Sequence, residues 1–350
     1  MKSIDIDGRR IASDAPPYVI AEISGNHNAS LDRAFALMDA AKTAGADAVK
    51  LQTYTADTIT LDIDAPGFVI EDGLWKGRRL YELYDEAHTP WAWMQPLFEH
   101  GRRIGITVFS SPFDATAVDL LENLQAPAYK IASFEMVDLP LVRRCAATGK
   151  PLVISTGMAD ETEIGEAVAA ARDAGAREIA LLHCVSGYPA PAENMNLRTI
   201  ADLASRFEVT VGLSDHTLGI GAAVASVALG AAIVEKHLTL KRSDGGPDAA
   251  FSLEPTELAT LCREVRTAWH ALGRIDYGLK SSERSSVAYR RSLYVVEDVT
   301  AGEPFTLANV RSIRPGHGLP PRDIEAILGR PARMDVSRGT PLSMDLIDLS

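Results

Sequence analysis

The chain has 350 residues, of which 46% are hydrophobic, and it carries a formal net charge of −12 with an isoelectric point near 5.2. This length accommodates one large α/β domain and a smaller second domain. The acidic excess argues against a general nucleic-acid or anionic-membrane surface, although lysines gathered in a pocket can still bind an anionic small molecule.

The N-terminus and the cysteines favour a cytoplasmic protein. Residues 1–7 mix acidic and apolar side chains and lack the apolar region of a signal peptide. The longest nearly uncharged run, residues 218–234, is shorter than the roughly 20 residues that a membrane-spanning helix needs. Cys145, Cys184 and Cys262 are widely spaced and match no zinc pattern, so a reducing compartment is the simplest setting.

Apolar, β-branched segments alternate with amphipathic segments from residue 18 to about residue 271. The expected strands are residues 18–22, 47–52, 106–110, 128–131, 151–155, 178–183, 209–213 and 232–235. Each is followed by a plausible helix, as at residues 31–44 and 91–104. One connection is unusually long: residues 54–88 form an insertion, and loops of this length inside a compact domain usually serve function.

Eight strand–helix units over about 250 residues fit a TIM (β/α)8 barrel. A doubly wound open sheet is the alternative, but it usually has fewer strands and a Gly-rich nucleotide turn. No G-x-G-x-x-G follows the first strand. We therefore predict an α/β barrel over residues 1–275.

The pattern changes after the barrel. Residues 276–290 are polar and predict a linker. Residues 291–350 alternate short strands and turns, with one short helix near residues 323–328, and predict a small, mostly β domain. Because so small a core is marginal alone, we expect this domain to dock on another surface.

Two histidines end neighbouring strands of the predicted barrel. His216 follows residues 209–213, His237 follows residues 232–235, and one helix lies between them. A right-handed βαβ unit brings both to the C-terminal edge of the sheet, where barrel enzymes keep their chemistry. Two neutral imidazoles beside Ser214 suit Mn²⁺ or Mg²⁺ in an open site. The alternative is a pair of hydrogen-bonded core histidines.

Other strand ends are polar as well, which predicts a pocket at the top of the barrel. Lys50 and Lys130, with Ser133 nearby, favour binding of a phosphate or carboxylate. The alternative for each lysine is a solvated or ion-paired group. Glu235 and Lys236 precede His237 and alternate in direction, so we assign no role to Glu235.

With these positions defined, the chain resembles the sialic acid synthase family. The resemblance runs nearly end to end, through several long motifs in the same order. They are AEISGNHN (21–28), VKLQ (49–52), YKIAS (129–133) with Glu135, STGM (155–158), GLSDHT (212–217), EKH (235–237), GGPD (245–248) and VRSIRPG (310–316). The last motif resembles that family's antifreeze-like (SAF) C-terminal domain.

Two features resemble the pseudaminic branch of the family in particular. One is the insertion segment GLWKGRRLYELY at residues 73–84, followed by HTPW at 88–91. The other is CVSGYP at 184–189, where N-acetylneuraminate synthases have Asn at the position of Ser186. A legionaminic or N-acetylneuraminic acid synthase, acting on another 2-acetamido sugar, is the alternative within the family.

The resemblance implies condensation of phosphoenolpyruvate with the open-chain aldehyde of 2,4-diacetamido-2,4,6-trideoxy-L-altrose, giving a nonulosonic acid and phosphate. A divalent metal on His216 and His237 would then polarise the aldehyde, and Glu22 would orient or deprotonate the attacking water. The implied ligands of phosphoenolpyruvate are Lys50, Lys130, Ser133, Ser155, Ser186 and Ser214. Those of the sugar are Gln52, Glu135, Tyr188 and Asp248.

The resemblance also implies a homodimer. In the family, the antifreeze-like domain covers the active site of the other subunit, so Arg314 would contact the sugar N-acetyl group of the partner's site. A function from another class is a carbohydrate-binding or scaffold protein that kept the barrel and lost catalysis. That alternative predicts loss of the histidine pair or the lysines, and all four residues are present.

Overall fold

The structure, a computed structural model, describes residues 2–349 and divides the chain into two compact units. The first unit ends at Gly273 and the second begins at Arg274. Each unit has its own hydrophobic core, and the two cores share no residue.

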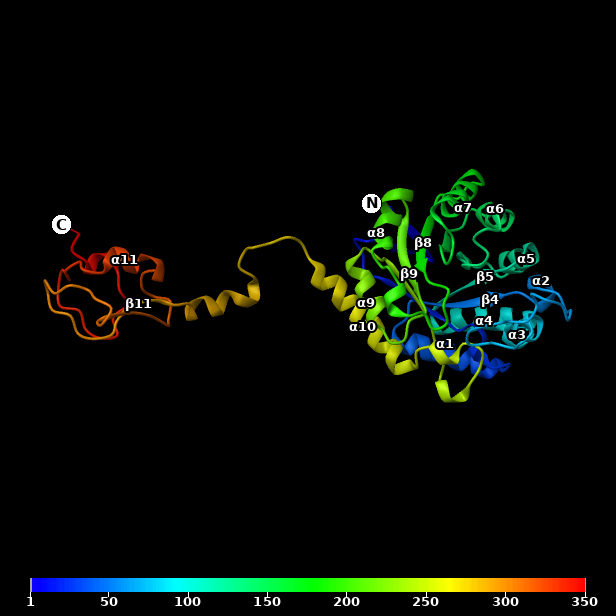
Figure 1. The fold of residues 1–350 in the computed structure, drawn as a ribbon, viewed down its shortest axis with the longest axis horizontal. Helices are drawn as coiled ribbons and strands as arrows, with labels where there is room; N and C mark the ends of the chain where they lie inside the picture. The colour runs from blue at the N-terminus through cyan, green and yellow to red at the C-terminus, as the bar shows by residue number, and fades with distance from the viewer. Residues whose placement is uncertain (1, 350) are drawn as a thin grey trace. The chain divides into compact units, whose positions relative to one another are not determined.

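The first unit is a closed barrel of eight parallel strands, which confirms the predicted fold (Figure 1). Around the barrel the order is β10-β3-β4-β5-β6-β7-β8-β9. The strands are β3 Tyr18–Glu22, β4 Ala48–Thr53, β5 Thr107–Pro112, β6 Tyr129–Ile131, β7 Leu152–Ser155, β8 Ile179–Cys184, β9 Thr210–Asp215 and β10 Ile233–His237.

Helices surround the strands and cover their outer face (Figure 1). They are α1 Leu31–Ala44, α2 Ala56–Ile59, α3 Leu80–Ala87, α4 Trp91–Ile104, α5 Ala115–Asn123, α6 Leu139–Ala146, α7 Glu161–Asp173, α8 Thr199–Phe207, α9 Gly221–Ala228 and α10 Pro255–Leu272. Short 3-10 helices occur at η1 Ser24–His27, η2 Ala192–Asn194, η3 Arg242–Asp244 and η4 Ala249–Phe251. Helix α1 shows the local logic: Ser30 caps its N-terminus by accepting from the Arg33 amide, and Gly45 ends it with φ +89°.

The predicted strand ends were too early at several places. Strand β5 continues to Pro112, β9 to Asp215 and β10 to His237. The polar residues at the end of β10 stay in the sheet because both neighbouring strands extend as far. Glu235 pairs with Ser214 of β9, and His237 pairs with Glu22 of β3. Closure of the barrel therefore extends regular structure into positions whose side chains do not favour strands.

Alternation along the strands separates the barrel interior from its outer layer. Ile20, Ala48, Ala128, Val153 and Ile233 belong to one buried cluster inside the barrel. The side chains two residues further along each strand also point into the barrel, because residues i and i+2 of a strand lie on the same face. Those next positions are Glu22, Lys50, Lys130, Ser155 and Glu235. The apolar interior thus becomes a polar floor at the C-terminal end of the strands.

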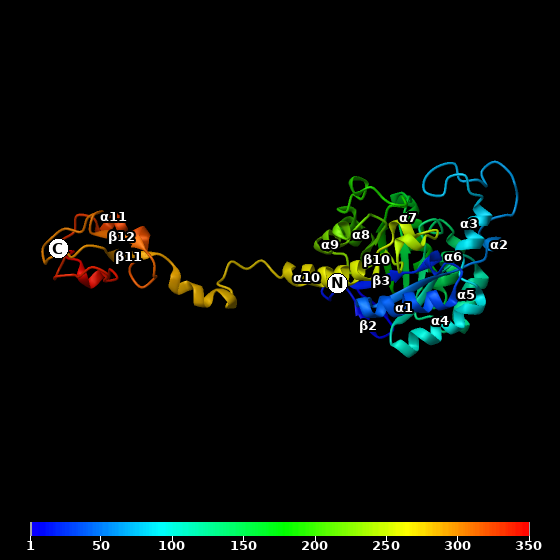
Figure 2. The same cartoon turned by 90° about the horizontal axis from the view of Figure 1, so that it is seen from below.

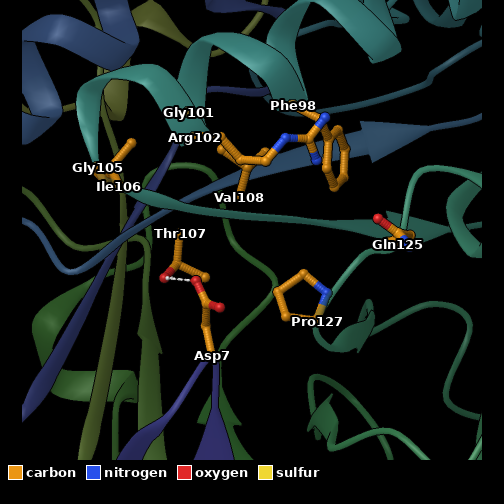
Figure 3. A pocket seen from close by; sticks show the side chains of 10 residues that line it. All are labelled: Asp7, Phe98, Gly101, Arg102, Gly105, Ile106, Thr107, Val108, Gln125 and Pro127. Atoms are coloured by element: carbon orange, nitrogen blue, oxygen red, sulfur yellow. Dashed lines mark hydrogen bonds between the residues drawn. The ribbon is translucent and has the colours of Figure 1, made fainter.

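An N-terminal hairpin, which the sequence did not reveal, lies at the other end of the barrel. Strands β1 Ile4–Ile6 and β2 Arg9–Ile11 pair in antiparallel fashion, and their isoleucines join the interior cluster. A cavity of about 440 Å³ lies beside the turn of the hairpin, between α4 and the start of β5 (Figure 3). There the Thr107 hydroxyl donates to Asp7 at 3.0 Å. This cavity is at the N-terminal ends of the strands, away from the polar floor.

The long insertion forms α2, α3 and the extended segment between them, drawn in light blue in Figure 2. Val69 and Arg79 form an antiparallel bridge that folds residues 70–78 back as a hairpin-like loop. The Ile70 amide donates to the Arg78 carbonyl at 2.9 Å, and the Gly77 amide donates to the Ile70 carbonyl at 2.8 Å. The insertion is therefore an ordered part of the barrel unit.

The second unit contains one two-stranded antiparallel sheet, β11 Ser292–Val295 with β12 Val310–Ile313, and several isolated bridges. Its helices are η5 Ser281–Tyr289, η6 Pro321–Asp323, α11 Ile324–Ile327 and η7 Met344–Leu346. Leu293, Val295, Phe305 and Leu342 are among its fully buried core residues. Within residues 2–349, no helix is long and apolar enough to cross a membrane, and Cys145, Cys184 and Cys262 are buried free thiols.

Candidate active site

The register of β9 and β10 brings the two predicted histidines together. Glu235 lies opposite Ser214, and Lys236 lies opposite Asp215. His237, the last residue of β10, is therefore beside His216, which directly follows β9. Their ring centroids are 5.4 Å apart. Asp215 and Lys236 point the other way and form a fully buried ion pair at 2.7 Å. This outward pair ties the two strand ends together.

The surroundings of the histidines favour neutral rings. Burial lowers the pKa of both His216 and His237, and for His237 the neighbouring His216 and Lys50 lower it further. His216 Nδ1 lies 3.0 Å from the Val185 carbonyl, a bond that orients the ring. His237 Nδ1 is buried, has no hydrogen-bond partner among residues 2–349, and lies 3.8 Å from Asp248 Oδ2. A buried imidazole nitrogen without a partner is a potential metal ligand.

The floor of the pocket is a cluster of buried charges. The Lys50 ammonium pairs with Glu22 and lies 3.5 Å from Glu235. Lys130 donates to Ser155 Oγ at 2.7 Å and lies 3.9 Å from Glu235. Ser214 donates to Glu235 Oε1, the oxygen that Lys130 approaches, at 2.8 Å. Two cations therefore share one carboxylate at the centre of the site.

Glu235 is the site residue that the sequence analysis missed. Burial alone would raise its pKa, but Lys130 and Lys50 outweigh burial and hold the pKa at about 2. Burial lowers the pKa of Lys130, and the charge of Glu235 partly offsets this effect. For Lys50, the charges of Glu22 and Glu235 together outweigh burial and raise the pKa. The signal was available: Glu235 is two residues before His237 and so faces the same side of the strand.

Hydroxyl groups surround the lysines. Ser133 and Ser186 lie 2.9 Å apart between their Oγ atoms, and Lys50 donates to Ser111 at 3.4 Å. Gly157, at φ +50°, follows β7 closely beside this serine pair. A Cβ atom at Gly157 would overlap Ser133 and press on Ser186 Oγ. Glycine is therefore required for the backbone to approach the hydroxyls.

Glu22 lies beneath this cluster and is completely buried. Its Oε1 accepts hydrogen bonds from the amide and the hydroxyl of Ser24, at 2.8 and 2.6 Å, and its Oε2 faces Lys50. Gln52 donates to the same Ser24 hydroxyl at 2.7 Å. This network holds Glu22 in one orientation.

The predicted sugar ligands line the upper part of the same pocket, a cavity of about 560 Å³. The Tyr188 ring lies 4.6 Å from that of His216. Burial raises the pKa of Glu135 to about 7, and burial together with Glu22 raises that of Asp248 to about 6. Glu135 can therefore carry a proton near neutral pH and Asp248 somewhat below it, and a protonated carboxyl can donate a hydrogen bond.

Replacing Glu135 with glutamine is expected to raise the melting temperature of the substrate-free protein at pH 8 but not at pH 4. A free glutamate titrates near 4.5, so a pKa of about 7 means that the folded state binds this proton more tightly. The contribution to the free energy of unfolding is complete below pH 4.5 and falls by about 1.4 kcal/mol per pH unit toward pH 7. Melts of wild type, Glu135→Gln and the control Glu166→Gln, on the exposed face of α7, test this. Equal pH slopes for all three contradict the raised pKa.

The structure brings most of the predicted site residues into one pocket. Its lining includes Lys50, Gln52, Lys130, Ser133, Glu135, Ser155, Tyr188, Ser214, His216, His237 and Asp248. Glu22 and Ser186 lie just behind the lining, bonded to Lys50 and Ser133 respectively. Arg314 belongs to the second unit, directly after β12, and is not among the lining residues.

Comparison with known proteins gives the family of the chain. The NeuB family matches residues 37–277, and the SAF domain matches residues 290–348. The chain belongs to the NeuB family. The predicted resemblance to sialic acid synthases and the predicted SAF domain are thereby confirmed.

Relatives of this NeuB-family chain are similar along their whole length. A pseudaminic acid synthase from Helicobacter pylori is 41% identical over 337 residues, which cover 96% of this chain and 99% of the relative. A pseudaminic acid synthase from Campylobacter jejuni is 42% identical over 330 residues, with coverage of 94% and 96%. The crystal structure of N-acetylneuraminic acid synthetase from Leptospira borgpetersenii, in complex with citrate, has a TM-score of 0.73 at 30% identity and covers 82% of this chain and 95% of that one.

Membership of the NeuB family also decides between the two classes of function considered from the sequence. The relatives are named as acid synthases, and the chain is an enzyme of their family. The alternative of a non-catalytic binding protein is therefore set aside.

Proposed function

We propose that this chain condenses phosphoenolpyruvate with the open-chain aldehyde of 2,4-diacetamido-2,4,6-trideoxy-L-altrose, giving pseudaminic acid and phosphate. One observation carries the proposal: two buried lysines with serine hydroxyls share a pocket with a pair of neutral histidines. The similarity to two pseudaminic acid synthases supports the sugar. Family membership supports the coarser statement, synthesis of a nonulosonic acid.

The charged floor binds phosphoenolpyruvate in this proposal. Lys50 and Lys130 supply positive charge at its phosphate and carboxylate, and the Ser155 hydroxyl, which accepts from Lys130, can donate a further hydrogen bond. The Ser214 hydroxyl donates to Glu235 and so holds that carboxylate beside the two lysines. Glu235, together with Glu22 at Lys50, favours the charged forms of both ammonium groups against the effect of burial. An anion that binds at this floor exchanges its hydration water for hydrogen-bond donors whose positions the protein already fixes.

The histidine pair fits a divalent ion such as Mn²⁺ or Mg²⁺. Burial lowers the pKa of both rings and so favours their neutral forms, and within the described part of the chain His237 Nδ1 has no hydrogen-bond partner. Among the residues that the structure describes, no group of three or more His, Cys, Asp or Glu side chains is arranged to hold a metal. Two protein ligands leave positions open for water and substrate oxygens, as a catalytic site requires. When bound there, the ion supplies Lewis-acid polarisation of the aldehyde oxygen.

The protein's own side chains orient the reacting atoms. C3 of phosphoenolpyruvate attacks the aldehyde carbon, water adds to C2, and cleavage of the C2–O bond releases phosphate. Glu22, fixed by Ser24 and Lys50, orients the water in this proposal. Glu135, Tyr188 and Asp248 face the sugar. The carboxyl of Glu135, whose pKa is about 7, can donate to a sugar hydroxyl or acetamido oxygen, and Asp248, whose pKa is about 6, accepts from a sugar hydroxyl when it is ionised.

Phosphate release tests the proposed sugar. Phosphoenolpyruvate and Mn²⁺ are incubated with the full chain and either 2,4-diacetamido-2,4,6-trideoxy-L-altrose or N-acetylmannosamine. We expect kcat/KM to favour the trideoxy sugar by at least about 100-fold, since binding energy of groups remote from the aldehyde is used in the transition state. A preference for N-acetylmannosamine, or for a legionaminic acid precursor in a third reaction, would assign the alternative sugar.

We also propose a homodimer in which Arg314 acts in the partner's site. Arg314→Ala and His237→Ala are each expected to be nearly inactive. Mixing the two variants, with exchange of subunits, is expected to restore up to about a quarter of wild-type activity, because half of the chains form heterodimers that contain one intact site. If Arg314 acts within its own chain, mixing restores no activity, and that result contradicts the proposal. A fully active monomer in sedimentation would contradict it as well.

A further inference from the structure

The insertion contributes to the lining of the pocket, and most of the side chains that it contributes are apolar. Eight residues of the insertion line the cavity, and six of them are here called the insertion wall: Ile59, Ile70, Trp75, Leu80, Leu83 and Tyr84. The charged groups of the pocket come instead from the barrel strands and from the segments that follow them. The pocket therefore has a charged floor and an apolar wall.

The insertion wall is held in place by defined contacts. Beside the Val69–Arg79 bridge, the Leu80 amide donates to the Phe68 carbonyl at 2.9 Å. At the tip of the loop, Trp75 Nε1 donates to the Pro247 carbonyl at 2.9 Å. This bond uses the single polar atom of the indole. The wall is thus fixed to the barrel, and the indole has no donor left for a ligand.

Ring contacts join the wall to the histidine pair. The Trp75 ring lies 5.3 Å from that of Tyr188, which in turn lies 4.6 Å from that of His216. A sugar chain whose aldehyde lies at His216 and His237 therefore reaches the wall with the carbons furthest from the aldehyde.

We propose that the insertion wall is a specificity site for sugars that end in a methyl group, that is, for 6-deoxy 2-acetamido sugars. This inference rests on the proposed function and names the part of the pocket that selects the sugar. A methyl group packs against the side chains of Ile70 and Leu80 and leaves water without loss of a hydrogen bond. A hydroxymethyl group at the same place loses its water and meets no donor or acceptor on these side chains.

The expected selectivity follows from the chemistry of such a wall. An apolar pocket rejects an added hydroxyl by about tenfold to 100-fold in kcat/KM. The measurement compares 2,4-diacetamido-2,4,6-trideoxy-L-altrose with its 6-hydroxy counterpart at saturating phosphoenolpyruvate. We expect wild type to prefer the 6-deoxy sugar by this factor.

Ile70→Asn is the test variant, and Val69→Asn is its matched control. Val69 precedes Ile70 in the same bridged segment, points to the opposite face and does not line the pocket. Ile70→Asn is expected to reduce the preference for the 6-deoxy sugar at least fivefold, whereas Val69→Asn leaves it within twofold. The KM for phosphoenolpyruvate should stay within twofold in both. Leu80→Asn, elsewhere on the wall, gives the same test if Ile70→Asn does not fold.

The outcomes separate this inference from the proposed function. If wild type forms no keto acid from either sugar, the proposed function is wrong and the wall has no such substrate. If wild type uses both sugars equally, or if the wall variants keep the full preference, only the specificity of the wall is overturned. A reduced preference in wall variants with a normal KM for phosphoenolpyruvate supports it.

Discussion

Replacing His237 with alanine is expected to lower kcat at least about 1,000-fold, with little change in the melting temperature. The ring lies 5.4 Å from that of His216, and burial favours its neutral form. Its Nδ1 has no hydrogen-bond partner among the residues that the structure describes. Without the Lewis acid, the transition state loses several kcal/mol of stabilisation. A barrier that is higher by about 4 kcal/mol lowers the rate by this factor. Because the ring makes few bonds that hold the fold, its loss acts on chemistry rather than on stability.

Binding of Mn²⁺ to the substrate-free protein separates the proposed ligand role from other roles of His237. Calorimetric titration is expected to show one site in wild type and none in His237→Ala or His216→Ala. His183→Gln is the matched control, since His183 also lies in a barrel strand but bonds the Met195 carbonyl behind the sheet. Full turnover in chelated buffer, or unchanged Mn²⁺ binding by the alanine variants, would end the metal proposal.

The second large effect is expected for Glu235→Gln, which removes the carboxylate shared by Lys50 and Lys130. Lys50 keeps Glu22 as a partner, but Lys130 loses its nearest carboxylate in a fully buried position. Breaking a buried ion pair costs about 3–5 kcal/mol of stability. Since burial then favours the neutral form of Lys130, we expect kcat/KM for phosphoenolpyruvate to fall at least about 100-fold, mainly through a higher KM.

A double variant separates the effect of Glu235→Gln on stability from its effect on binding of phosphoenolpyruvate. Glu235→Gln with Lys130→Met removes both buried charges, and it is expected to melt at a higher temperature than Glu235→Gln alone while remaining inactive. Chemical denaturation gives the stabilities, and phosphate release gives the KM. If Glu235→Gln keeps the wild-type KM, then Lys130 does not depend on this carboxylate and our account of the floor is wrong.

The fold was predictable because its signal is periodic. Eight alternating strand and helix patterns led to the barrel, and the polar residues at the strand ends led to most of the polar side chains that line the pocket. The limits of the strands were less predictable, since Glu235, Lys236 and His237 owe their extended backbone to pairing with β3 and β9 rather than to their own preferences. The three-residue strands of the N-terminal hairpin are too short to carry a periodic signal.

The site was predictable where a side chain's direction follows from its position in a strand. It was not predictable where the side chain belongs to a loop. Glu235 could have been assigned to the pocket by its two-residue offset from His237. The insertion wall could not, because the place of Trp75 depends on a bridge between Val69 and Arg79 and on a bond to Pro247, far away in sequence. The raised pKa of Glu135 likewise depends on burial that only the assembled pocket creates.

Mass spectrometry of the product tests the central claim most directly. The full chain is incubated with phosphoenolpyruvate, Mn²⁺ and 2,4-diacetamido-2,4,6-trideoxy-L-altrose, and His237→Ala serves as the inactive control. We predict a new acid whose mass equals that of the sugar plus pyruvate, formed in equal amount with phosphate and absent from the control. Phosphate released without this acid, or with free pyruvate in its place, would contradict condensation at the top of the barrel.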